Sequence, residues 1–131
     1  MKKSFVFVLC AVLCLCMLSA CTPHGALTVN GTRIDKGIVQ YFTDAVRQEQ
    51  PDAEEDALSA AVHRKIAVYV AVNSAFAERG LSLSASKKAE ISQSVNAKWR
   101  LFGAYYTGLG VNKQDLMKIE TSMGYKDAVL A

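Results

Sequence analysis

The chain has 131 residues, of which 51% are apolar and 21% are charged, with a formal net charge of +3. This length predicts a single domain, and the lack of low-complexity tracts argues against a mainly disordered chain. Lys2 and Lys3 supply two of the positive charges, so the remainder is nearly neutral. Its basic residues are scattered among acidic ones without forming a stripe, which argues against nucleic-acid binding.

The first twenty residues have the pattern of an export signal. Lys2 and Lys3 give a positive start, and an unbroken apolar run covers residues 5–18. That run is short for a transmembrane helix, which needs about 20 apolar residues. It leads into Leu-Ser-Ala-Cys at residues 18–21, which resembles the lipobox of bacterial lipoproteins.

The lipobox resemblance implies that the thiol of Cys21 receives a diacylglyceryl group and that the chain is cut just before it. Residues 1–20 are then a signal peptide and residues 21–25 a lipidated tether to a domain at residues 26–131. Stable anchoring takes more than one acyl chain, as in this family, so we expect the protein on the extracytoplasmic face of a bacterial membrane. Thr22 stands where Asp resembles an inner-membrane retention signal, which favours the outer membrane in a two-membrane envelope. The alternative is a secreted protein with a free Cys21.

A short hairpin and a first helix are predicted at the start of the domain. Residues 26–34 contain two alternating runs joined by Asn30-Gly31, a dipeptide that tolerates the positive φ angles of a type I′ turn. Asp35 is placed to cap a helix that extends to about Gln48. Apolar residues recur along it at helical spacing, at Ile38, Phe42, Ala45 and Val46.

The next predicted helix, over residues 54–79, is long. Acidic residues lie at positions 54–56, and Gly80 follows the last turn, which fits the helix dipole and a left-handed C-terminal cap. The apolar run at residues 66–72 is also compatible with a buried strand, but the apolar stripe continues beyond it. We therefore expect one helix that is largely buried in its middle.

Two further helices complete a mainly α fold, in which a short β-hairpin precedes about four helices. Ser84 is placed to cap the third helix and Asn112 the fourth, with Gly108 and Gly110 between them. Gly124 is expected to interrupt the fourth helix, after which residues 125–131 could add a turn. The predicted buried faces are Ile91, Val95, Trp99, Phe102 and Tyr106 in the third helix, and Leu116, Ile119 and Met123 in the fourth.

No constellation of residues predicts catalysis, a metal site or a cofactor. His24 lies in the tether, and His63 lacks the His-Glu-x-x-His spacing of a zinc site. No serine lies in a Gly-x-Ser-x-Gly motif, and no phosphate-binding glycine loop is present. Cys10, Cys14 and Cys16 fall within the signal, so a structural disulfide is not expected either.

An aromatic group near the end of the third helix is the candidate binding site. Helical spacing cannot place all its members on one face. The stripe residues Trp99, Phe102 and Tyr106 are favoured as core, whereas Leu101 and Tyr105 point elsewhere. Exposed apolar patches are candidate contact surfaces for another chain. The candidate client-binding residues are Trp99, Leu101, Phe102, Tyr105 and Tyr106.

The order of these parts resembles the N-terminal region of extracytoplasmic foldases of the SurA and PrsA type, which are related in fold to the trigger-factor substrate-binding domain. The resemblance rests on Val-Asn-Gly at residues 29–31, on Gly-Leu-Ser-Leu-Ser at residues 80–84 after a long helix, and on Gly-Val-Asn at residues 110–112. It covers about residues 26–130. It implies binding of unfolded exported proteins through apolar surfaces. The family's parvulin-type isomerase domain, of roughly a hundred residues, has no room in this chain.

Members of the family often complete the helical domain with a segment that returns after the isomerase. Without such a segment, an apolar groove along the long helix could remain open. Two hypotheses follow: a lipid-anchored, non-enzymatic chaperone-like module for unfolded or partly folded exported proteins, or a lipoprotein that docks one specific envelope protein or a second copy. An N-terminal part of a longer peptidyl-prolyl isomerase is a third reading.

Overall fold

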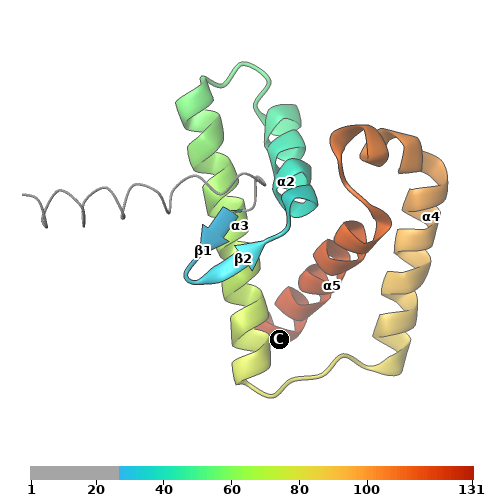
Figure 1. Ribbon diagram of the computed structural model, residues 1–131. Coiled ribbons are helices and arrows are strands. Elements are labelled where there is room, and N and C mark those ends of the chain that lie inside the picture. The colour runs from blue at the N-terminus through green and yellow to red at the C-terminus, as the bar shows by residue number, and fades with distance from the viewer. Residues whose placement is uncertain (1–26) are drawn as a thin grey trace, which may run out of the picture.

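The computed structural model describes residues 27–131, of which 77% are helical. A two-stranded antiparallel hairpin precedes four helices, as the sequence predicted (Figure 1). The predicted signal peptide, the lipidation site Cys21 and the tether lie outside the described residues. Among residues 27–131, no helix combines the length and apolar character needed to cross a bilayer.

The hairpin consists of β1 (Leu27–Val29) and β2 (Thr32–Ile34). Leu27 pairs with Ile34 across the two strands. Asn30 and Gly31 have φ angles of 48° and 78°, the left-handed values that a type I′ turn requires. Ile34 is buried against α3, so the hairpin is attached to the helical core by its apolar face.

The first two helices are α2 (Lys36–Glu49) and α3 (Glu55–Glu78). Asp35 occupies the N-cap position of α2, but its side chain makes no capping hydrogen bond. Its carboxylate instead accepts a hydrogen bond from Lys118 of α5 (Lys113–Leu130). The predicted start of the helix is therefore confirmed, whereas the predicted capping hydrogen bond is wrong. The carboxylate of Asp35 binds Lys118, 83 residues away in the sequence, and not the backbone of its own helix.

The remaining caps follow the sequence prediction closely. Ser84 accepts a hydrogen bond from the backbone nitrogen of Lys87 at 3.1 Å, at the start of α4 (Ala85–Leu109). Asn112 and Asp115 form a reciprocal capping box at the start of α5. Gly110, between the two helices, has a φ of 80°, which favours glycine.

Gly124 does not interrupt the fourth helix, contrary to the sequence prediction, since α5 continues to Leu130. A Cβ atom at position 124 would lie 3.0 Å from Cδ1 of Ile91, and the side chain of Leu83 is the next neighbour. The missing side chain therefore allows α4 and the segment before it to approach α5 closely. Packing across the interface outweighs the modest cost of glycine within a helix.

Helix α5 lies between α3 and α4 (Figure 1). It contributes to two apolar clusters. The larger cluster joins the hairpin, α2, α3 and Ile119 of α5. The smaller one joins α4 to Leu116 of α5. The buried members are Ile34, Ile38, Val46, Leu58, Ala61, Val62, Ile66, Val70 and Ile119 in the first, and Ile91, Val95 and Leu116 in the second.

The middle of α3 is buried on one face only, which corrects the expectation that it is largely buried. Ile66 and Val70 lie in the core, whereas Val68 is 52% exposed. The helix carries apolar residues around more of its circumference than its neighbours cover. An apolar strip of α3 therefore remains accessible on the side that faces α2 and α5.

Candidate functional site

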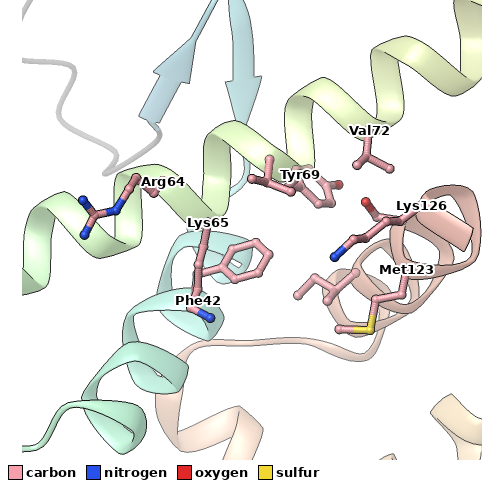
Figure 2. Close-up of a pocket in the computed structure, with 10 residues that line it drawn as sticks. Phe42, Arg64, Lys65, Tyr69, Val72, Met123 and Lys126 are labelled. Carbon is pink, nitrogen blue, oxygen red and sulfur yellow. The ribbon is translucent and has the colours of Figure 1, made fainter. Parts of the chain in front are cut away.

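An apolar cleft of about 320 Å³ lies where α2, α3 and α5 meet. Figure 2 shows its lining side chains, with Phe42 from α2, Tyr69 and Val72 from α3, and Met123 from α5 around one space. We call it the α3 cleft. Its lining residues are Phe42, Arg64, Lys65, Val68, Tyr69, Val72, Ile119, Ser122, Met123 and Lys126.

The α3 cleft runs along the long helix, where the sequence resemblance suggested that an apolar groove could remain open. Val68 and Met123 are each about half exposed, so their apolar surface is available to a ligand. Ile119, in contrast, is fully buried and forms the floor. Removing this accessible apolar surface from water is the driving force that the cleft offers to an apolar ligand.

Met123 was predicted in the buried face of the fourth helix, and the structure corrects this. Ser122 occupies the inward position instead, where its hydroxyl oxygen accepts a hydrogen bond from Asn73 of α3 at 3.2 Å. This polar contact joins α5 to α3, and the next residue, Met123, lies at the edge of the cleft.

Tyr69 and the basic residues give the cleft its polar character. Burial raises the pKa of Tyr69 above its ordinary value, against an opposing effect from the positive charge of Lys118. A tyrosine hydroxyl is already protonated at neutral pH at the ordinary pKa of 10.0, and the raised pKa keeps the Tyr69 hydroxyl a hydrogen-bond donor to higher pH. Lys65 donates a hydrogen bond to Glu49 of α2 at 2.9 Å, across one end of the cleft.

The predicted client-binding residues of α4 separate into two groups. Trp99 and Tyr106 are half-buried, with nearly parallel rings whose centroids are 6.5 Å apart. Tyr106 also stacks on Tyr41 of α2 at 6.3 Å. These two residues belong to the packing between α2 and α4, as the sequence favoured.

Phe102 was also favoured as core, but it is 53% exposed. The ring of Trp99 lies over Gly103, where a Cβ atom would come within 3.3 Å of it. Position 103 therefore lies on the side of α4 that carries Trp99. Phe102, the preceding residue, points to a different side of the helix and is exposed to solvent. Leu101, predicted to be exposed, is 69% exposed. We call Leu101 and Phe102 the α4 patch.

Tyr105 is exposed, as predicted, but its hydroxyl is engaged. It donates a hydrogen bond to Asp44 of α2 at 2.7 Å and accepts one from Gln48 at 2.9 Å. The hydrogen bond to Asp44 raises the pKa of Tyr105 above its ordinary value. This residue therefore joins α4 to α2, and only its ring is open to a ligand.

The structure does not bring the α4 residues to the α3 cleft. The two surfaces are lined by different sides of α2, with Tyr41 facing α4 and Phe42 facing α3. The sequence signal for the cleft was the apolar run at residues 66–72, which exceeds what one buried face requires. Within residues 27–131, no group of three His, Cys, Asp or Glu side chains is placed to hold a metal ion.

Comparisons of the chain with protein families, with curated proteins and with solved structures found no match. Function is therefore inferred from the geometry of the α3 cleft and the α4 patch.

Proposed function

We propose that the protein is a lipid-anchored, extracytoplasmic binding module that holds apolar segments of unfolded exported proteins without catalysing a reaction. The lipobox resemblance at residues 18–21 supports the anchor, and the likeness to the SurA and PrsA type supports the class of client. The single observation that carries the proposal is the open, mainly apolar α3 cleft between α2, α3 and α5.

The size of the cleft suits a short stretch of chain. Fully burying one aliphatic or aromatic side chain contributes about 1.5–3 kcal/mol, so a few client side chains supply modest binding energy. Association and ordering of the client oppose this gain. The expected affinity is weak and the exchange rapid, which suits temporary protection of a chain that must be released to fold.

A second candidate function is the docking of one folded envelope protein. The α4 patch favours it, because Leu101 and Phe102 are exposed side by side at a helix surface, outside the α3 cleft. Such a surface predicts stoichiometric binding to one partner. The two functions differ in the surface that binds the other protein: the α3 cleft for an unfolded client, and the α4 patch for a folded partner.

The test measures binding of a permanently unfolded, carboxymethylated and fluorescently labelled protein by anisotropy, with suppression of client aggregation as the second readout. The lipidated protein is held in phosphatidylcholine nanodiscs, and empty nanodiscs are the blank. We expect saturable binding that M123Q weakens severalfold. L130S is the matched control, because Leu130 is 74% exposed and lies outside the cleft. Absence of binding by the folded protein would contradict the proposal.

A further inference from the structure

The charged side chains that line the α3 cleft are all cationic, and one acidic neighbour, Glu49, pairs with Lys65 at one end. Three of its lining side chains are cationic, namely Arg64, Lys65 and Lys126, and no Asp or Glu lines it. The chain beyond its first twenty residues is nearly neutral, so this imbalance is local to the cleft. A concave apolar surface with cationic edges concentrates a positive potential where a ligand would lie.

Two of the three cations have no partner within the domain. Lys65 is paired with Glu49, but Arg64 and Lys126 make neither an ion pair nor a side-chain hydrogen bond within residues 27–131. Figure 2 shows Arg64 at one end of the lining, with its guanidinium pointing away from Phe42, and Lys126 of α5 on the other side of the space. Eight residues of helix separate Arg64 from Val72, a distance of about 12 Å along α3.

We infer that the α3 cleft selects apolar segments that carry a carboxylate at each end, with Arg64 and Lys126 as the residues that determine this preference. The inference rests on the proposed client binding. Four residues of extended chain span about 13 Å, close to the rise of α3 between Arg64 and Val72. An apolar core of four residues then lies over Val68 and Val72, and its acidic neighbours reach Arg64 and Lys126.

The shape of the site favours a chain segment over a membrane surface, because the apolar residues line a hollow between three helices and do not form a protruding face. A second copy of the protein is also a poor match. Its exposed α4 patch directly follows Arg100, so docking it would bring another cation to a cationic site. An apolar segment of another protein with acidic residues at both ends can contact the apolar lining and also pair with the cationic side chains.

The experiment compares three end-blocked, fluorescein-labelled peptides that share one apolar core of four residues. Their flanks are two aspartates, two asparagines or two lysines on each side. Binding to the lipidated protein in phosphatidylcholine nanodiscs is followed by anisotropy. The aspartate peptide gains exposed ion pairs and the lysine peptide meets like charges, so we expect roughly tenfold tighter binding of the aspartate peptide than of the lysine peptide. Added salt should reduce this ratio.

Paired variants assign the preference to the cleft. R64Q/K126Q should bring the ratio between binding of the aspartate peptide and binding of the lysine peptide close to one. K36Q/K113Q is the matched control, because it removes the same charge from two exposed residues that line no part of the cleft. M123Q should weaken the binding of all three peptides to a similar extent. This separates the contribution of apolar contacts to binding from the contribution of charge.

Equal binding of the three peptides, or equal effects of the two double variants, overturns the charge preference and leaves the proposed function standing. Failure of all peptides while the unfolded client still binds does the same. Failure of the unfolded client itself overturns the proposed function and this inference together. Binding to vesicles containing phosphatidylglycerol that R64Q/K126Q abolishes, without a preference among the peptides, replaces the peptide segment by an anionic lipid and overturns the inference.

Discussion

The phenol of Tyr105 donates a hydrogen bond to the carboxylate of Asp44 at 2.7 Å, across 61 residues of sequence. This contact joins the C-terminal part of α4 to the middle of α2, and Gln48 donates to both partners. A residue that the sequence predicted as a free client-binding side chain therefore also holds two helices together.

Replacing Tyr105 with Phe removes a contribution to stability that depends on pH. The hydrogen bond to Asp44 raises the pKa of Tyr105 above its ordinary value of 10.0. Because the pKa is higher in the folded state than in the unfolded state, the hydrogen bond contributes its full stability below about pH 10. This contribution to the free energy of unfolding is lost as the pH rises through the pKa of Tyr105 in the folded state. We expect Y105F to be less stable than the wild type at neutral pH, with a smaller difference at alkaline pH. Urea unfolding across this range measures it, and a constant difference contradicts it.

Gly37 is the point where α2 meets the start of α5. A Cβ atom at position 37 would lie 2.0 Å from Oδ2 of Asp115, whose carboxylate accepts a hydrogen bond from the backbone of Asn112. We expect G37A to lower the free energy of unfolding by about 1–3 kcal/mol, because this buried carboxylate must move.

Gly108 provides the control for that substitution. It also lies within a helix, but a Cβ atom there meets nothing within 4 Å. G108A should raise the free energy of unfolding by up to about 1 kcal/mol, since alanine is the better helix former. Thermal unfolding of both variants measures the contrast, and equal effects would refute the close approach of α2 to Asp115.

Asp35 and Asn112 were both predicted as helix caps, but only Asn112 makes a capping hydrogen bond, so replacing them should reduce stability by different amounts. N112A removes an acceptor that caps α5, and we expect a loss of about 1 kcal/mol. D35A removes only an exposed ion pair with Lys118, and its cost should stay below about 1 kcal/mol. Urea unfolding tests the order of the two losses. A larger loss for D35A than for N112A is incompatible with the capping pattern described above.

Lipidation of Cys21 is testable independently of the fold. We expect mass spectrometry of the protein from bacterial membranes to find an N-terminal peptide that begins at Cys21 and carries a diacylglyceryl group. C21S should lack this modification, and its precursor should remain uncut. A mature chain that begins at another residue, or that has an unmodified thiol at position 21, rules out the anchor.

Local interactions explain why much of the fold was predictable. Ser84 and Asn112 hydrogen-bond to backbone groups three residues away, so their role is visible in the sequence itself. Asp35 and Gly124 looked equally local, but their partners are Lys118 and the side chains of α4 and its preceding segment. Such partners become known only when the helices are arranged in space.

The candidate site was less predictable, because exposure depends on how each helix is rotated against its neighbours. Phe102 and Met123 have the spacing of buried residues, yet Gly103 and Ser122 take the inward positions. A rotation of one residue decides whether an apolar side chain joins the core or lines a cleft. The sequence shows that the middle of α3 has more apolar residues than one buried face requires. It does not show which of these residues remain accessible to a ligand.

Photo-crosslinking from the α3 cleft tests the central claim most directly. A photoreactive amino acid replaces Met123 at the edge of the cleft or, as the control, Ala89 on the exposed surface of α4. With an unfolded exported protein as client, position 123 should give crosslinks that saturate with client concentration, and position 89 should give few. Equal yields from both positions, or none from position 123 while the client is bound, would contradict the assignment of the cleft as the binding site.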